Sequence, residues 1–598
     1  MSLRNDTDTI DRPGDEEIAE LLLQVGSRRI SRREVLRRGI ALGLTVPAIG
    51  WLLAACGGDD DDTAPTATAG SGEVPTPTTA PGETPTAGTP QGGGRLTIIV
   101  TGNIPDLDPQ SAYDSTASSV FFGTYEMLVR LKGSDTFEYE PMLASEWSSD
   151  PEYKEWTFTI PDGVLFHDGT TCDAEAVAQS FRRFHKMQLG PTDVIRRFVS
   201  DPDTQIVAVD KNTVKFTLDT GNDIFLAAMA SQYGPLVVSP AAVEANKTPD
   251  DEFAHEWFRE NVVGTGPYKL REYIQNDRIV IERFEDFHGG WDGPHFDEIV
   301  FRIVPESATR RQLIEAGEAD ALTQSLTVRD VTSIEQAGKL NVLRYDSTHV
   351  AWTVLNCGAK IKDPKARQGF SYAFPYEDVR QGVYEGLIIR TSGPCTPTTR
   401  GYDPNGFIYD TDLDKAKQLL EEAGWDFNEK LEYWLSSSSD NDISVAQLFQ
   451  ANLQKIGITM DIVQKEEGAL TDFNYSETPP EERPHFVSWG WWPDYNDAYN
   501  EIYPNFASAS WTPNGSNAGF YKNDRLDEIL DTVAPGVPAE EYTTLMAEAN
   551  NILTEQDPAA IYWGSVNWYT ILQPNIKGFE HNPIYLNTYN VYRMYREG

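Results

Sequence analysis

A basic segment, an uncharged stretch and a cysteine follow one another near the N-terminus, and together they constrain where the rest of the chain can fold. Residues 28–38 contain six arginines and a single acidic residue, Glu34. No charged residue occurs in 39–55, and Cys56 follows directly. The uncharged stretch is shorter than the about 20 residues that span a bilayer, and it contains Pro47, which suits a cleavable export signal. The sequence therefore predicts that the chain after this segment folds outside the cytoplasm.

Two short motifs in this segment resemble export and lipidation signals. Residues 31–36 (Ser-Arg-Arg-Glu-Val-Leu) are similar to the twin-arginine export motif, which a receptor reads. Residues 53–56 (Leu-Ala-Ala-Cys) resemble the bacterial lipobox, in which the cysteine thiol takes a diacylglycerol. We therefore expect Arg32 and Arg33 to direct export and Cys56 to be lipidated on the outer face of the cytoplasmic membrane. An uncleaved membrane helix is the alternative, and its flanking arginines would also leave the bulk of the chain outside.

The chain after the signal peptide (1–55) begins with a low-complexity stretch. Residues 57–94 are nearly all Gly, Asp, Thr, Pro, Ala and Ser. Such a stretch cannot bury enough apolar surface to offset the entropy lost on ordering, so we predict a disordered tether over 56–94. The remaining 95–598 is too long for one hydrophobic core, and two or three lobes are expected.

The charge of the chain excludes some partners. The formal net charge is −43 at pH 7. We expect no nucleic-acid partner, because phosphate binding requires a basic surface that releases counterions. Direct adsorption to anionic lipid is disfavoured for the same reason. A cationic or neutral ligand is compatible with this charge.

The four cysteines allow at most one internal disulfide if Cys56 is lipidated. The other three are Cys172, Cys357 and Cys395. Cys357 and Cys395 are the candidate pair, because both lie beside predicted loops and the compartment permits a disulfide. No Cys-x-x-Cys pair occurs, so we expect no zinc or redox site and no metal or other cofactor.

Strand and helix patterns alternate along the folded part of the chain. Strands are predicted at 96–100, 156–160, 279–284, 298–303 and 459–463, with two more in 206–218. Helices are predicted at 118–131, 173–186, 308–316, 412–423 and 445–456, with Asp173 as an N-cap. This alternation indicates an α/β architecture of more than one lobe.

A series of motifs in a fixed order resembles one known family. The motifs are 107–109 (Leu-Asp-Pro), 125–128 (Tyr-Glu-Met-Leu), 141–147 (Pro-Met-Leu-Ala-Ser-Glu-Trp), 163–170 (Gly-Val-Leu-Phe-His-Asp-Gly-Thr), 264–268 (Gly-Thr-Gly-Pro-Tyr), 414–425 (Asp-Lys-Ala-Lys-Gln-Leu-Leu-Glu-Glu-Ala-Gly-Trp) and 557–558 (Asp-Pro). In this order they resemble the extracellular solute-binding proteins of family 5, the peptide, oligopeptide and nickel receptors of ABC importers. Each motif alone is better explained by local structure, so the series points to the fold and does not mark the site.

The resemblance implies a periplasmic-binding-protein-like α/β fold of type II with an extra lobe. Two lobes would clasp the ligand and be joined by a hinge. Lobe I would comprise 95–135, 259–345 and 571–598, the extra lobe II 136–258, and lobe III 346–570. The implied partners are permease subunits in the membrane with an ATPase on the cytoplasmic side. We expect a monomer that is not an enzyme.

Residues 488–497 form the strongest candidate for contact with a ligand. Three tryptophans and a tyrosine occur within seven residues there, an unfavourable set to expose to water. They could line a cleft or build an interlobe core. By the resemblance, Asp494 would pair with the α-ammonium of a peptide, and Asn103 and Ile104 would offer polar groups to an extended ligand. The candidate ligand-binding residues are Asn103, Ile104, Trp489, Gly490, Trp491, Trp492, Asp494 and Tyr495.

One residue in this segment departs from the pattern of the family. Ser488 stands where oligopeptide receptors can have an arginine for the ligand's carboxylate, and Arg483 is the nearest arginine before it in the sequence.

Three functions remain open at this point. The first is a lipid-anchored receptor that captures a peptide and hands it to a permease. The second is the same role for an oligosaccharide, with Trp511, Trp563 and Trp568 stacking on sugar rings together with the segment above. The third is an extracytoplasmic hydrolase, since carboxylates are abundant, although no catalytic motif is present. Eight scattered histidines disfavour nickel or haem as the ligand.

Overall fold

The computed structural model describes residues 90–598, which belong to one unit, Ala87–Gly598. The predictions for the signal peptide, for Arg32, Arg33 and Cys56, and for most of the tether lie outside these residues. No helix within 90–598 is long and apolar enough to cross a membrane.

The last residues of the predicted tether are part of the fold. Pro90–Gln91 (β1) pairs antiparallel with Tyr595–Glu597 (β22), which also pairs with Ile576–Lys577 (β21). The described fold therefore starts before residue 95.

A seven-stranded mixed sheet forms one half of the described unit, with the order β13-β20-β12-β2-β11-β10-β9. Its strands are Arg95–Val100 (β2), Tyr268–Ile274 (β9), Arg278–Arg283 (β10), Glu298–Ile303 (β11), Ala321–Thr323 (β12), Asn341–Tyr345 (β13) and Trp568–Leu572 (β20). β2 lies at the centre, parallel to both neighbours. Its side chains are apolar on both faces because each face is covered: Ile99 packs with α11 (Ser307–Ala316) and α12 (Val328–Ala337), and Ile98 packs in the larger core on the other side.

The N-terminal part of the chain also forms a small lobe. Its four-stranded sheet runs β5-β6-β8-β7, made of Glu146–Ser149 (β5), Glu155–Thr159 (β6), Ile206–Ala208 (β7) and Thr213–Thr217 (β8). Its helices are Ala174–Met187 (α5), Asp193–Arg196 (α6), Pro202–Gln205 (α7), Phe225–Met229 (α8), Pro240–Asn246 (α9) and His255–Phe258 (α10). The predicted cap of α5 is confirmed, since Asp173 accepts a hydrogen bond from Ala176 N.

The helix predicted over 118–131 is wrong in its second half. The helix is Ser115–Thr124 (α4), capped by Asp114, and the backbone is extended at Tyr125. Val129–Leu131 (β3) instead pairs with Tyr139–Pro141 (β4). The apolar residues of this region belong to both α4 and β3. They are buried on every side, so the sequence has no amphipathic period that would mark the end of the helix.

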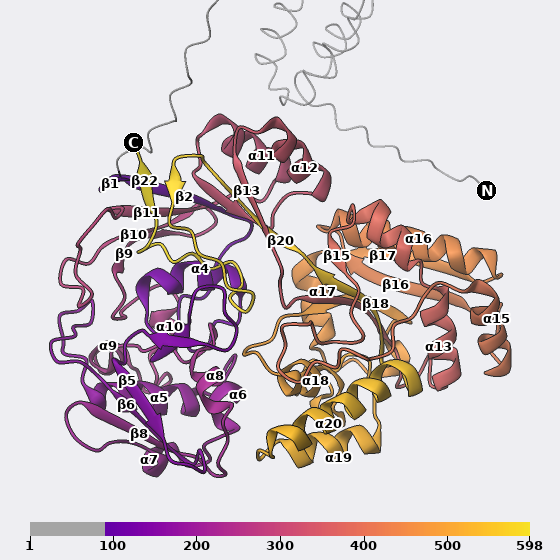
Figure 1. Ribbon diagram of the computed structural model, residues 1–598, viewed down its shortest axis with the longest axis horizontal. Coiled ribbons are helices and arrows are strands. Elements are labelled where there is room, and N and C mark those ends of the chain that lie inside the picture. The colour runs from indigo at the N-terminus through magenta and orange to yellow at the C-terminus, as the bar shows by residue number, and fades with distance from the viewer. Residues whose placement is uncertain (1–89) are drawn as a thin grey trace, which may run out of the picture. The chain divides into compact units, whose positions relative to one another are not determined.

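A six-stranded sheet forms the other half, with the order β15-β19-β14-β18-β16-β17. Its strands are Val350–Leu355 (β14), Ile388–Ile389 (β15), Lys430–Ser436 (β16), Thr459–Lys465 (β17), Phe486–Trp491 (β18) and Ala560–Val566 (β19). One face packs on Pro364–Ala373 (α13), Leu413–Glu422 (α15) and Asp440–Lys455 (α16); the other packs on Ala498–Phe506 (α18), Asp524–Val533 (α19) and Ala539–Asn551 (α20) (Figure 1). Glu467–Asn474 (α17) precedes β18.

The chain passes between the two large sheets at two adjacent places. Residues 346–349 join β13 to β14, and Asn567 joins β19 to β20. The two connections are bonded to each other: Ser347 Oγ donates to Val566 O at 2.7 Å, and Asn567 Nδ2 donates to Asp346 Oδ1 at 3.0 Å. The sheets are thus joined by two short, paired segments, a geometry that suits a hinge.

The predicted disulfide between Cys357 and Cys395 is absent from the structure, where both residues are free thiols, as is Cys172. The Cys357 thiol lies just after β14 and donates to Leu355 O, at the end of that strand, at 3.3 Å. Burial raises the pKa of both thiols, which keeps them protonated.

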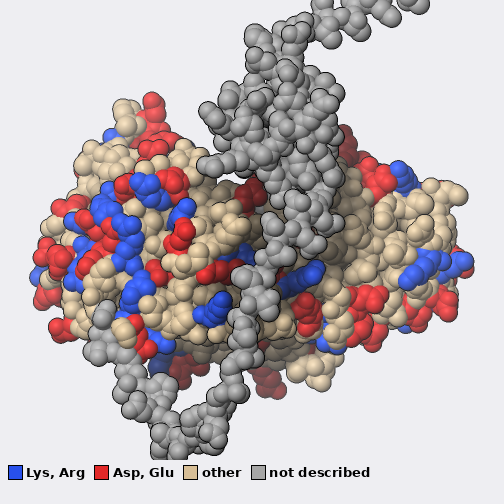
Figure 2. Space-filling model, turned by 90° about the horizontal axis from the view of Figure 1, so that it is seen from above, with Lys and Arg blue, Asp and Glu red and all other residues tan. Residues whose placement is uncertain are grey.

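Charged side chains of both signs are interspersed over the face that Figure 2 displays. Many of them form exposed pairs, such as Lys211 with Asp162 and Lys132 with Glu138. Exposed pairs of this kind contribute little to stability.

Candidate ligand-binding site

β18 and the segment that follows it hold most of the predicted site residues. β18 lies inside the six-stranded sheet, between β14 and β16, so the chain leaves the sheet at Trp491 and enters α18 at Asp497. Asp497 caps this helix by accepting a hydrogen bond from Tyr499 N. Strand alternation turns Trp489 and Trp491 toward α18–α20, and it turns the position of Gly490 toward the opposite face.

Asp494 is a buried carboxylate that only neutral groups contact. Its side chain accepts hydrogen bonds from Tyr113 OH at 2.5 Å and from Asn500 Nδ2 at 3.0 Å. No Lys, Arg or His among residues 90–598 forms an ion pair with it. Burial raises the pKa of Asp494 to about 6, although the two hydrogen bonds oppose this. The site is therefore electrostatically suited to a cation.

The partner of Asp494 comes from the other half of the protein. Tyr113 lies just before α4, its ring packs edge-on against Tyr233 at 5.0 Å, and its side chain is still 46% exposed. The two residues after Asp494 make similar contacts. Arg197 Nη1 donates to Tyr495 OH at 2.6 Å, and Asn496 Nδ2 donates to Thr136 O at 3.2 Å. Three consecutive residues of this segment thus bind the N-terminal half.

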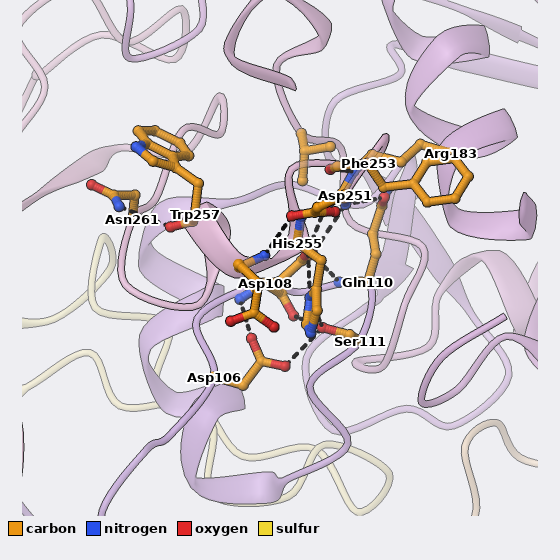
Figure 3. Close-up of polar contacts among 12 residues, drawn as sticks. Asp106, Asp108, Gln110, Ser111, Arg183, Asp251, Phe253, His255, Trp257 and Asn261 are labelled. Atoms are coloured by element: carbon orange, nitrogen blue, oxygen red, sulfur yellow. Dashed lines mark hydrogen bonds and ion pairs between the residues drawn. The ribbon is translucent and has the colours of Figure 1, made fainter. Parts of the chain in front are cut away.

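The loop that carries Tyr113 is fixed by a buried ion pair (Figure 3). Arg183 from α5 donates to both carboxylate oxygens of Asp108, at 3.1 and 2.5 Å, and to Gln110 Oε1 at 2.8 Å. Burial alone would raise the pKa of Asp108, but the guanidinium and its hydrogen bonds hold it below its usual value. The position of Tyr113 at the site therefore depends on this pair.

A serine, a histidine and two aspartates meet beside this pair, but their geometry is not that of a catalytic triad. Ser111 Oγ donates to Asp106 Oδ2 at 2.7 Å and lies 3.1 Å from His255 Nδ1 (Figure 3). Asp108 Oδ2 lies 3.3 Å from the same Nδ1. A relay needs the serine and the aspartate on opposite ring nitrogens. The hydrogen bond to Asp108 raises the pKa of His255. We therefore interpret the cluster as a set of structural contacts that hold the loop in place.

Asn103 and Ile104 are bonded within their own half. Asn103 Oδ1 accepts from Asn276 N at 3.0 Å, and Ile104 O accepts from Tyr273 OH at 2.6 Å. The Ile104 side chain is fully buried. No hydrogen bond joins either residue to 489–495 in the described part of the chain.

Arg483 and Ser488 are both committed to protein partners. Arg483 Nε donates to Thr478 O at 2.8 Å and its Nη2 donates to Ser476 O at 2.9 Å, which ties the loop before β18. Burial lowers the pKa of Arg483 to about 10. Ser488 Oγ donates to Asp442 Oδ2 at 2.7 Å. Neither side chain is placed to pair with a ligand carboxylate.

The tryptophans divide into two groups. Trp563 is 2% exposed and donates to Thr353 Oγ1 at 2.9 Å, and Trp568 is 6% exposed, so neither offers a ring face to a sugar. The indole N–H groups of Trp489, Trp491 and Trp492 are buried and have no hydrogen-bond partner. Buried donors of this kind are rare in folded proteins, and they mark a place where an acceptor is expected.

Glu501 was not predicted from the sequence. It lies one turn after Asp497 on α18, is fully buried, and neither of its carboxylate oxygens has a hydrogen-bond partner. Burial, and then the charges of Asp494 and Asp497, raise its pKa well above the usual value, so Glu501 is neutral. The four-residue spacing from Asp497 within an aromatic segment was the only signal. No group of His, Cys, Asp or Glu within 90–598 could hold a metal ion.

We expect the Glu501→Gln variant to gain stability over the wild type as the pH rises. In the unfolded chain Glu501 ionises near its usual pKa, whereas the folded protein keeps it protonated, so the wild type loses about 1.4 kcal/mol of unfolding free energy per pH unit between these two pKa values. Glutamine does not titrate. Urea unfolding of both proteins at pH 5 and pH 8 measures the difference, and an equal difference at the two pH values would contradict a neutral Glu501.

Comparison with known proteins gives the family of this chain. Residues 138–513 match the model of the bacterial extracellular solute-binding proteins, family 5 middle region. The chain is 28% identical over 509 residues to the probable D,D-dipeptide-binding periplasmic protein DdpA of Escherichia coli K12, covering 83% of this chain and 94% of that protein. It is 26% identical over 496 residues to the heme-binding protein A of Haemophilus influenzae. The match covers 79% of this chain and 86% of that protein.

The fold matches solved structures over most of its length. The periplasmic binding protein DppA of Helicobacter pylori, solved with the peptide STSA, superposes with a TM-score of 0.74 at 25% identity, covering 85% of this chain and 99% of that one. This match confirms the predicted α/β binding-protein fold. The family consists of binding proteins, which also confirms that the chain is not an enzyme. The match to the family model spans more than half of the sequence, and this protein belongs to the bacterial extracellular solute-binding proteins of family 5.

Proposed function

We propose that this protein is the substrate-binding component of an ABC importer and that it binds short peptides with a free N-terminal amine. Asp494 carries the proposal. It is 8% exposed, it receives hydrogen bonds only from Tyr113 and Asn500, and no cation of the described chain pairs with it. A peptide ammonium would supply that charge, and a charge-assisted hydrogen bond of this kind contributes about 1.5–3 kcal/mol.

Peptide ligands recur among the relatives, which also include the heme-binding protein A. One is named for D,D-dipeptides, another is a dipeptide-binding protein of Escherichia coli that is 26% identical, and the Helicobacter pylori structure holds a peptide. The oligosaccharide alternative loses two of its expected stacking faces, because Trp563 and Trp568 are buried. The remaining proposed contacts are Trp489, Gly490, Trp491, Trp492 and Tyr495 around Asp494, with Asn103 and Ile104 at the edge of the other half.

Delivery would follow from closure of the two halves. The paired segments 346–349 and Asn567 are the proposed hinge, and a ligand held between Asp494 and the Tyr113 loop would favour the closed state by its differential affinity. We further propose export through Arg32 and Arg33 and lipidation at Cys56. The anchor would hold the protein beside the permease, which would take up the released peptide. The ATPase would lie on the cytoplasmic side of the membrane.

Ligand identification tests the proposal. The purified full-length chain is analysed by native mass spectrometry, and any released compound is identified after denaturation. Binding of a panel of di- and tripeptides and of matched oligosaccharides is then measured by calorimetry. We expect one-to-one binding of peptides without turnover. Binding of sugars alone, or consumption of any peptide, would overturn the proposed function.

A further inference from the structure

One histidine of this protein lacks a hydrogen-bond partner on its ring. The chain has eight histidines, all within residues 90–598. Seven of them contact a backbone carbonyl or a carboxylate: His167, His185, His255, His288, His295, His485 and His581. No hydrogen bond or ion pair of the described chain involves the ring of His349. The other seven histidines each use a ring nitrogen for a structural contact, so His349 is an exception.

The sheet register places His349 at the proposed site. β14 and β18 are antiparallel, with Val350 opposite Trp491, so the next pair along is His349 and Trp492. Their rings stack at 3.8 Å with an angle of 15° between the planes. Trp568 packs edge-on against Trp492, at 6.0 Å between the ring centres. The imidazole is thus held in one orientation, in the segment that crosses between the two halves.

Gly490 makes room for this ring. It is the diagonal neighbour of His349 across the two strands, and a Cβ added at this position would collide with His349 Nε2. Any residue other than glycine would displace the imidazole. The lack of a side chain in the middle of an aromatic strand is therefore explained by the close approach of His349.

The hydrogen-bonding groups in this place are neutral and unused. Burial lowers the pKa of His349 to about 3, so near neutral pH its ring offers one N–H donor and one nitrogen acceptor. The indole N–H of Trp492 is another donor here, and it is buried without a partner. Among residues 90–598, no charged group shifts the pKa of this imidazole, so nothing in the described chain favours a carboxylate here. Two donors and one acceptor suit a ligand group that both accepts and donates hydrogen bonds. An amide is such a group.

We propose that His349 and Trp492, arranged around Gly490, form a subsite that binds an amide group of the ligand. This inference rests on the proposed peptide-binding function. The carbonyl oxygen of the amide accepts from an N–H of the subsite, and the amide N–H donates to the free imidazole nitrogen. The amide belongs either to the peptide backbone or to a side chain of the ligand. Asp494, two residues further along, binds the ammonium group independently.

Four small compounds and one ring substitution test the subsite. Calorimetry compares Ala-Ala with its ester analogue, alanyl-lactic acid, and compares Ala-Asn with Ala-Leu, which has nearly the same shape. His349→Phe keeps the stacked ring and removes both hydrogen-bonding nitrogens. We expect the wild type to prefer the amide in one of the two pairs by about tenfold, a difference typical of one or two hydrogen bonds. The pair that shows it identifies the amide. In His349→Phe the ratio of the two affinities in that pair should fall close to one.

Two further variants keep the test decisive. His349→Asn retains a donor and an acceptor and should restore part of the preference, whereas Tyr153→Phe alters an exposed ring of the small lobe and should leave the preference unchanged. An unchanged preference in folded His349→Phe and His349→Asn, or no preference in the wild type, overturns the subsite and leaves the proposed function standing. A wild-type protein that binds none of the four compounds overturns the proposed function and the subsite with it.

Discussion

Replacing Asp494 with asparagine is expected to weaken the binding of a peptide with a free N-terminal amine about 100-fold. Removing one partner of a buried, hydrogen-bonded charge pair costs about 2–5 kcal/mol, and 2.7 kcal/mol corresponds to a factor of 100. Asparagine has the same size and can still bond to Tyr113 and Asn500, which are the present partners of the carboxylate. Calorimetry with a free and an N-acetylated form of the same peptide measures the effect.

The acetylated peptide is the internal control for this prediction. It lacks the charge that Asp494 would pair with, so wild type and variant should bind it equally. Tyr113→Phe, which removes a hydrogen bond but no charge, should have a much smaller effect on the free peptide. If both forms of the peptide lose affinity equally in the Asp494→Asn variant, the role assigned to the carboxylate is wrong.

The pH dependence of binding gives the same residue a second readout. The pKa of Asp494 is about 6 in the unliganded protein, so its carboxyl group takes up a proton as the pH falls through this value. Peptide amines stay protonated in this range, so the affinity of the wild type should fall below about pH 6. Loss of hydration at its hydroxyl and the charge of Asp494 raise the pKa of Tyr113, and burial raises the pKa of Tyr495, so both side chains stay neutral. Binding by the Asp494→Asn variant should be flat between pH 5 and 7.

Replacing Asp108 with alanine is expected to lower the free energy of unfolding by about 3–5 kcal/mol, because it leaves Arg183 buried without its charge partner. The two side chains are 0% and 5% exposed, so water cannot replace the lost carboxylate. Arg183 would keep only neutral acceptors, Gln110 Oε1 and Phe253 O. Urea unfolding followed by tryptophan fluorescence measures the loss.

An exposed pair provides the matched control. Lys211 and Asp162 are 66% and 71% exposed, and pairs of this kind contribute at most about 1 kcal/mol. Asp162→Ala should therefore barely shift the unfolding curve. A shift of similar size in both variants would show that burial does not set the energy of the Asp108 pair. Since this pair anchors the Tyr113 loop, Asp108→Ala should also weaken peptide binding below the unfolding transition.

Local signals in the sequence predicted elements that depend on local chemistry. Asp173 and Asp412 were predicted as helix starts, and each caps its helix as an acidic side chain does wherever it precedes an amphipathic run. The strands predicted at 96–100 and 279–284 are confirmed. A short run rich in β-branched residues favours a buried strand. The helix predicted over 118–131 failed because the packing around it, and not its propensity, decides where it ends.

The candidate site shows the same division. The aromatic and acidic segment 488–497 stands out in the sequence because few soluble surfaces carry such a set. The partners of this segment could not be predicted: Tyr113 lies 381 positions away from Asp494, and Arg197 lies 298 positions from Tyr495. The missing disulfide has the same origin, since the Cys357 thiol lies in the turn after β14 and bonds back to Leu355 O.

The sequence by itself determined the family and the α/β class and indicated the candidate segment for the site, because these depend on motif order, on periodicity and on residue types. Tertiary structure alone decided that Asp494 lacks a cation, that Glu501 is buried without a partner and that His349 lies against Gly490 and Trp492. The physical reason is that charge state and hydrogen-bond satisfaction depend on distance and burial. Those quantities arise only when strands far apart in the chain pair and two sheets enclose the same few side chains.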